Sequence, residues 1–315
     1  MKAVVYNKRS SPDKLVFCDI DKPVPKDNEV LIKVHAVSLN AADYRSMKMG
    51  IIPKNKIFGA DISGRIETAG KSISAFKPGD EVLGDLANFG FGGLAEYVTA
   101  PEGAVIFKPR HISFEEAAAI PMAATTALQG LRDKASIKKG QKVLIVGSAG
   151  GVGSFAIQLA KYFGAEVTGV CSSGNVQQSF SLGADYVIDY SKESFLQSDK
   201  RYDIILAING NYPLFSYRRI LTANGTYIMV GGSLSQIFKS LLFGRILSFG
   251  SKKMKSLSAK ASKTDLEFLA NLADKGIIKP VIDRRYSFDQ AIDAMNYLKQ
   301  GHAAGKIVIS VESVS

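Results

Sequence analysis

The stretch 143–165, VLIVGSAGGVGSFAIQLAKYFGA, most constrains how this chain can fold, because an apolar run breaks into glycines and then resumes with helical spacing. The apolar residues 143–146 predict a buried strand, and the positions beyond the glycines predict an amphipathic helix. Only glycine permits so tight a turn and so close an approach of backbone N–H groups to a pyrophosphate at a positive helix terminus. We therefore interpret the loop as a dinucleotide-binding site in preference to a purely structural turn. A P-loop is excluded because no Gly-Lys-Ser/Thr follows the glycines.

The hydrophobic pattern changes along the chain. The first hundred residues hold short alternating segments such as KAVVY and EVLIKVHAVSL between Gly, Pro and Asp turns, which predicts a compact β-rich domain. Ser113 and Glu116 form a capping-box pattern ahead of an alanine-rich helix. Pro121 should end or kink that helix, so a second helix is expected from about Ala123.

Strands and helices alternate from residue 141 onward. The alternation predicts an α/β fold with a mostly parallel, doubly wound sheet. A polar helix is expected at 176–182. The last stretch, 291–311, predicts a helix followed by an apolar strand that pairs back with the N-terminal domain.

Composition limits the kinds of site and partner. Two cysteines and three scattered histidines cannot make a disulfide framework or a recognisable zinc site, so no metal is expected. No apolar run reaches the roughly 18 residues of a membrane span, and no signal-peptide pattern follows Met1, so a cytoplasmic location is expected. The net charge of +11 suits phosphorylated cofactors, nucleic acids or acidic lipid surfaces, with a basic solvated surface as the simpler interpretation. No specific nucleic-acid partner is expected, because Phe and Tyr do not interleave with Lys or Arg.

The residues after the second strand of the alternating region bear on the choice of dinucleotide. An NAD-selective site places Asp or Glu there, whereas this chain has Cys171, Ser172, Ser173, Gly174 and Asn175. Because no carboxylate in this segment would repel a 2′-phosphate, the segment favours NADPH, with NADH as the weaker alternative. The serines could also simply form a turn.

Eight ordered segments carry a resemblance to a known family: NEVLIKVHAVSLNAADYRSMKMG, FGADISG, FKPGDEVLG, FGGLAEYV, AAAIPMAATTALQGL, GSAGGVGS, LGADYVIDY and GHAAGKIVI. In this order they resemble the medium-chain dehydrogenase/reductases, and within them the zinc-free quinone oxidoreductase branch. The resemblance implies a GroES-like β-rich catalytic domain at 1–120 and 264–315, with a Rossmann domain at 121–263. It also implies a homodimer.

The same resemblance identifies the positions at which a catalytic zinc would be bound. The positions matching the catalytic zinc ligands of the alcohol dehydrogenases are Asn40, Ala60 and Met122, and the position of the proton-relaying hydroxyl is Ala42. None of these supplies a thiolate or an imidazole. We therefore expect hydride transfer from NADPH to a substrate that is already electron-poor, a quinone or an α,β-unsaturated carbonyl.

The resemblance also implies roles for individual residues. Asn40 is expected to lie beside the nicotinamide and to orient the nicotinamide ring or the substrate. Tyr44 is a possible proton donor, although it could equally be a packing residue. Asp61 is expected to bond backbone. The expected cofactor contacts are Asn40, Thr126, Ala149, Gly150, Gly151, Val152, Ser172, Ser173, Asn175, Tyr190, Gly231, Gly232 and Lys306. Ser148, Gly174 or Asn175, and Ala304 depart from the family pattern and weaken the NADP assignment.

The segment 233–262 contains lysines and arginines but no acid. Its IFKSLLFGRIL stretch has roughly helical apolar spacing and would suit a membrane-surface element. A helix that covers the active site or forms a dimer contact is favoured, because Gly244 and Gly250 interrupt the pattern.

A catalytically silent dinucleotide-binding sensor or scaffold is the alternative to an enzyme.

Overall fold

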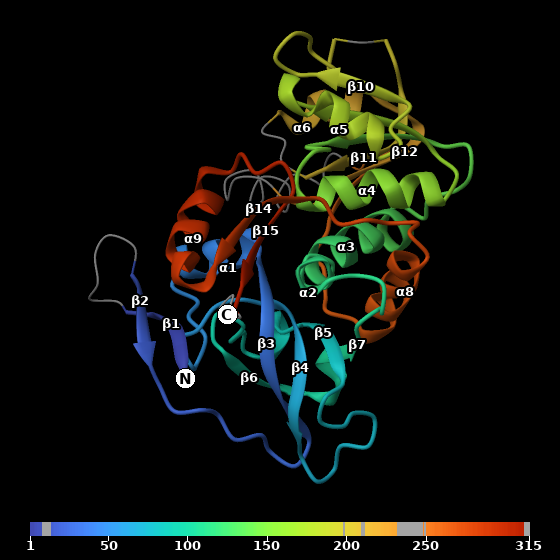
Figure 1. The fold of residues 1–315 in the computed structure, drawn as a ribbon. Helices are drawn as coiled ribbons and strands as arrows, with labels where there is room; N and C mark the ends of the chain where they lie inside the picture. The colour runs from blue at the N-terminus through green and yellow to red at the C-terminus, as the bar shows by residue number, and fades with distance from the viewer. Residues whose placement is uncertain (8–13, 198, 209–211, 232–247, 249, 312–315) are drawn as a thin grey trace. The chain divides into compact units, whose positions relative to one another are not determined.

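The computed structural model describes residues 1–7, 14–197, 199–208, 212–231, 248 and 250–311 (Figure 1). The chain forms two compact units. Unit 1 comprises Met1–Thr125 and Lys260–Ser315, and unit 2 comprises Thr126–Ala259. Unit 2 is therefore an insertion between the two parts of unit 1.

Unit 1 is built on a sheet of seven strands among the described residues, in the order β14-β15-β3-β4-β5-β7, with β6 also paired to β3. The C-terminal strand β15 runs antiparallel to β3, with Ile307 opposite Leu39, which confirms the predicted return of the chain end to the N-terminal sheet. A separate pair joins β1 and β2. The bounds are β1 Lys2–Tyr6, β2 Leu15–Asp19, β3 Glu29–Leu39, β4 Asp61–Ala69, β5 Glu81–Asp85, β6 Tyr97–Pro101, β7 Val105–Phe107, β14 Ile282–Ser287 and β15 Lys306–Ser310.

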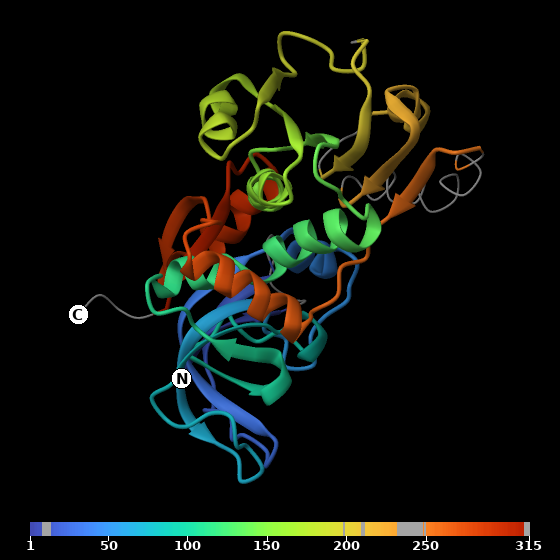
Figure 2. The same ribbon diagram turned by 90° about the vertical axis from the view of Figure 1, so that its right-hand side faces the viewer.

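Short helices flank this sheet. Ser113 accepts the Glu116 N–H at 3.1 Å and caps α2, as the capping-box pattern predicts. A second helix begins at Pro121 itself, because a first-turn proline has no N–H to satisfy. Helix α8 lies beside β7 (Figures 1 and 2). The bounds are α1 Ala41–Lys48, η1 Ala87–Phe89, η2 Glu102–Ala104, α2 Phe114–Ala118, α3 Pro121–Leu128, α8 Lys263–Asp274, η5 Phe288–Gln290 and α9 Ala291–Gln300.

Unit 2 is an α/β unit whose described strands form one parallel sheet in the order β10-β9-β8-β11-β12-β13. The chain moves outward from β8 in one direction and then from β11 in the other, which is the doubly wound pattern predicted from the alternation. Four of the five β8 residues are buried. The bounds are η3 Gln129–Lys134, β8 Lys142–Val146, α4 Gly151–Tyr162, β9 Glu166–Cys171, η4 Ser173–Asn175, α5 Val176–Ser181, β10 Tyr186–Asp189, β11 Tyr202–Ala207, α6 Leu214–Arg219, β12 Leu221–Met229 and β13 Lys253–Ser256.

The predicted amphipathic stretch at 237–247 lies outside the described residues, and so does Gly232. The described end of the basic segment forms β13, which pairs in parallel with β12. Within the described part of the chain, no helix is long and apolar enough to cross a membrane.

Candidate functional site

The glycine loop of unit 2 has the geometry that its sequence predicts. β8 ends at Val146, and Gly147 follows with φ +86°, a conformation that favours glycine. A Cβ on Gly153 would lie 2.1 Å from the Gly147 carbonyl oxygen, so only glycine allows the first turn of α4 to lie this close to the loop. The first N–H groups of α4 have no partner inside the helix. This helix start is suited to a pyrophosphate.

Most of the predicted cofactor residues of unit 2 gather at one edge of its sheet. Because all described strands of this sheet are parallel, their carboxyl ends share an edge. The segment 149–152 follows β8, 172–175 follows β9, Tyr190 follows β10, and Gly231 lies two residues after β12. Ligands of such sheets bind at this edge, where the strand order reverses. Thr126 lies apart from the edge in sequence, on α3, and is 9% exposed.

A carboxylate stands among the serines expected to hold a 2′-phosphate. Ser173 Oγ donates to Asp189 Oδ2 at 2.5 Å, and Ser191 donates to Asp189 Oδ1 from its N–H at 3.0 Å and from its hydroxyl. These hydrogen bonds hold the pKa of Asp189 at about 2. Segment 171–175 has no acid, as its sequence shows, but the neighbouring strand β10 supplies one. The Ser173 hydroxyl hydrogen is thus directed at Asp189 and not toward a ligand.

Asn40 and Lys306, both predicted site residues, meet in the interior of unit 1. Lys306 Nζ donates to Asn40 Oδ1 at 2.6 Å and lies 3.3 Å from Asp61 Oδ2. Asn40 Nδ2 donates to the same Asp61 oxygen at 2.9 Å. The Lys306 and Asp61 side chains are 3% and 0% exposed, so this is a buried ion pair bridged by an amide.

Both polar atoms of the Asn40 side-chain amide form hydrogen bonds in this ion-pair network. The oxygen accepts from Lys306, and the nitrogen donates to Asp61 and, at 3.4 Å, to the Ser38 carbonyl. Asp61 Oδ1 also accepts the Met122 N–H at 3.0 Å, the backbone bond expected of this acid. Asn40 and Met122, two of the positions compared with zinc ligands, are therefore linked through Asp61. No group of three or more His, Cys, Asp or Glu in the described ranges is arranged to hold a metal ion.

Comparison with known proteins bears on the family. Residues 26–110 match the alcohol dehydrogenase GroES-like domain, and 182–309 match the zinc-binding dehydrogenase domain. The chain is 33% identical over 324 aligned positions to the chloroplast envelope quinone oxidoreductase homolog of Arabidopsis thaliana, with 98% of each chain covered. This chain belongs to the medium-chain dehydrogenase/reductases, in the quinone oxidoreductase branch.

Two further proteins are similar to nearly the whole of this chain. The NADPH-dependent alkenal/one oxidoreductase of Arabidopsis thaliana is 30% identical, with 98% of this chain and 79% of the relative covered. The solved quinone oxidoreductase from Coxiella burnetii superposes with a TM-score of 0.89 at 30% identity, covering 99% of both chains. The medium-chain reductase fold is thus shared along the length of this chain, which is an NAD(P)H-dependent reductase of this family.

Two further carboxyls in unit 1 of this reductase have raised pKa values. Burial raises the pKa of Asp43 to about 6, although its oxygens accept the Asn40 and Gly59 N–H groups at 2.8 and 3.0 Å. Burial and the nearby Asp61 charge raise the pKa of Asp85 to about 7. Asp85 could not be predicted as a site residue from the sequence, because no local pattern marks it.

Tyr44 has the surroundings of a packing residue. Its half-buried ring packs against the core of unit 1, and Lys299 Nζ lies 6.0 Å from the ring centroid. Its role as a proton donor stays a prediction.

Proposed function

We propose that this chain is an NADPH-dependent, zinc-independent reductase that transfers hydride to a quinone or an α,β-unsaturated carbonyl. The observation that carries the proposal is the glycine-lined start of α4, where the space at Gly153 is closed to any Cβ. The dinucleotide fits this site, since the loop, the free helix N-terminus and the neighbouring strand ends all lie at one sheet edge. When bound, it supplies the hydride.

The residues of unit 1 favour a conjugated acceptor. Asn40, Ala60 and Met122 offer no thiolate or imidazole to a Lewis-acid metal. Conjugation lowers the need for such a metal, because negative charge develops on an oxygen that a hydrogen-bond donor can stabilise. The similarity to relatives named for quinones and for alkenals or enones supports the same class of acceptor.

In this proposal, unit 2 binds the dinucleotide and unit 1 the acceptor. The GroES-like domain is proposed at 1–120 and 264–315 and the Rossmann domain at 121–263, limits that lie within five residues of those of the two units. Asn40 orients the nicotinamide or the substrate, and its amide is held in one orientation by Lys306 and Asp61. Lys306, predicted as a cofactor contact, then acts through Asn40. Thr126 and Tyr190 contact the two ends of the cofactor.

The proposed oligomer is a homodimer formed through the edge of the Rossmann sheet, in the cytoplasm. A sedimentation experiment that finds only monomer at micromolar concentration would refute the dimer. Fractionation of cells with an antibody against the native chain tests the location.

The test of the reaction follows NADPH and NADH absorbance with purified, chelator-treated protein. The acceptors are 1,4-benzoquinone, 9,10-phenanthrenequinone and a short 2-alkenal, offered separately. Turnover that survives the chelator supports the proposal. Tight dinucleotide binding without turnover on any acceptor favours the sensor or scaffold, and unchanged turnover in Asn40→Ala refutes the role given to Asn40.

A further inference from the structure

Asp85 is a buried carboxyl placed beside another carboxyl. In the antiparallel pairing of β4 and β5, Asp85 stands directly opposite Asp61, so the two side chains are cross-strand neighbours. Asp85 is 8% exposed. Its Oδ1 accepts the Ala87 N–H at 2.9 Å, and among the described residues nothing donates to Oδ2.

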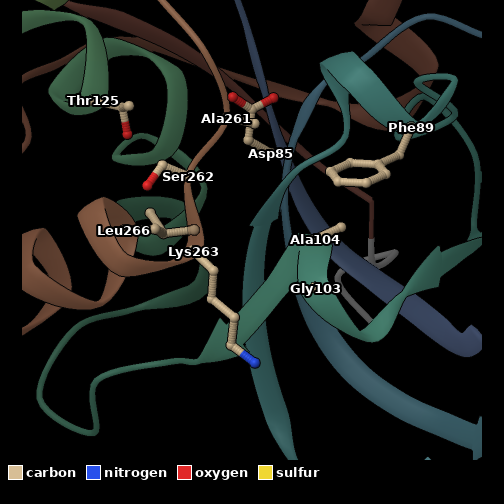
Figure 3. A pocket seen from close by; sticks show the side chains of 9 residues that line it. All are labelled: Asp85, Phe89, Gly103, Ala104, Thr125, Ala261, Ser262, Lys263 and Leu266. Atoms are coloured by element: carbon tan, nitrogen blue, oxygen red, sulfur yellow. The ribbon is translucent and has the colours of Figure 1, made fainter. Parts of the chain in front are cut away.

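The charges around Asp85 favour its neutral form. Lys306 pairs with Asp61, and no cation in the described ranges forms an ion pair with Asp85. Asp43 adds a second nearby carboxyl. Lys263 lies near the same region, but its ammonium is 5.7 Å from the Phe76 ring centroid and points away from Asp85 (Figure 3). Desolvation and the like charges raise the pKa of Asp85 to about 7, so much of it is protonated at neutral pH.

Asp85 also lines a pocket that lies within unit 1 (Figure 3). The pocket opens to solvent and has a cavity volume of about 30 Å³, so it can take the carbonyl end of a substrate and not the whole molecule. Phe89 lies on the same side of the pocket as Asp85, and Thr125 and Ser262 lie across from them. Since Oδ1 already accepts the Ala87 N–H, Oδ2 is the oxygen left to carry the proton of a neutral Asp85, and Asp85 is one of the residues that line the pocket.

We propose that Asp85 is the hydrogen-bond and proton donor to the carbonyl oxygen of an α,β-unsaturated substrate bound in this pocket. The inference rests on the proposed function and names the group that polarises the acceptor. A neutral carboxylic acid can do this work without a metal, because it donates a hydrogen bond to an oxygen that gains negative charge.

The reaction balances in atoms and electrons. When bound, NADPH would supply the hydride that forms the C–H bond at the β-carbon; the C=C electron pair would then move toward the carbonyl carbon and the carbonyl π pair to oxygen. The Asp85 O–H bond breaks as its proton passes to that oxygen, giving an enol, NADP⁺ and the Asp85 carboxylate. The enol tautomerises to the saturated carbonyl, and Asp85 regains a proton from solvent.

The first measurement is enone binding, without turnover. The dissociation constant of 2-cyclohexenone is determined by calorimetry in the absence of dinucleotide at pH 6 and pH 9, for wild type, Asp85→Asn and the surface control Asp27→Asn. We expect wild type and Asp27→Asn to bind roughly tenfold more tightly at pH 6, because only a protonated Asp85 donates. Asp85→Asn should bind with no pH dependence. A wild-type constant that is independent of pH, or an unchanged dependence in Asp85→Asn, overturns the inference.

The second measurement is NADPH-driven reduction of the same enone across pH 5–9. In wild type, kcat should fall above about pH 7. In Asp85→Asn, kcat should be about 100-fold lower or more and should no longer fall above this pH. The affinity for NADPH should stay unchanged. A variant with wild-type kcat and pH profile overturns the inference. Absence of turnover in wild type together with pH-dependent enone binding would refute the proposed reaction and keep Asp85 as a carbonyl-binding group. Thermal unfolding checks that each variant is folded.

Discussion

Replacing Lys306 by Met should destabilise the folded chain, because the buried Asp61 carboxylate loses its partner. The ammonium donates to Asn40 Oδ1 at 2.6 Å and pairs with Asp61 at 3.3 Å, and both charged side chains are at most 3% exposed. Without it, the donors to Asp61 among the described residues are the Asn40 side-chain amide and the Met122 N–H. Removing one partner of a buried ion pair costs about 3–5 kcal/mol.

Protonation of Asp61 in the variant has a cost of the same magnitude. If Asp61 takes up a proton to avoid carrying an unpaired buried charge, the cost is about 1.4 kcal/mol for each pH unit above its unfolded pKa of about 4. At pH 7 that is about 4 kcal/mol. The native variant then binds more protons than the unfolded chain, so its stability falls as pH rises from about 4.

The assay is urea unfolding of wild type, Lys306→Met and the double variant Asp61→Asn/Lys306→Met at pH 5 and pH 7.5. Because the chain has two units, differences from wild type are compared and not absolute free energies. The single variant should lose roughly 3 kcal/mol more at pH 7.5 than at pH 5, and the double variant should recover much of the loss. Lys22→Met, which breaks an exposed pair with Glu67, is the control and should change little. A loss that is the same at both pH values would show that Asp61 does not take up a proton in the variant.

Three further outcomes are expected. Asp189→Asn frees the Ser173 hydroxyl and removes a negative charge, so titration should show the ratio of NADPH to NADH affinity rising roughly tenfold; an unchanged ratio would separate Asp189 from the choice of cofactor. Gly153→Ala places a Cβ 2.1 Å from the Gly147 oxygen, so both dinucleotides should bind at least about tenfold more weakly, and normal binding would contradict the proposed loop. Tyr44→Phe should keep more than about a tenth of wild-type kcat, because the ring packs against the core; a loss of about 100-fold would return the proton-donor role to Tyr44.

Features encoded within a few residues could be predicted from the sequence. The strand, glycine loop and helix at 143–162 are specified locally, by a turn that requires glycine and by apolar spacing. The capping of α2 is local too, and Pro121 marks the helix break, with α3 starting two residues before the expected position because proline itself occupies the first helical turn.

Contacts between distant segments could not be predicted in the same way. Lys306 and Asp61 are 245 residues apart, and their pairing depends on β15 returning beside β3. Asp85 faces Asp61 only through the register of β4 and β5, which no sequence pattern specifies. The position of Asp189 beside the serines could have been predicted, because the carboxyl ends of neighbouring parallel strands lie together and β10 ends in an acid.

The return of β15 to the first sheet sets the order in which a newly made chain can mature. All of unit 2 leaves the ribosome before β15, so the inserted unit can fold while the unit that begins the chain still lacks a strand. At 5–20 residues per second, Asp61 precedes its lysine by roughly 12–50 seconds. During that interval β3 has an open edge and Asp61, on β4, lacks the counter-charge of Lys306, so β15 completes the interior of unit 1.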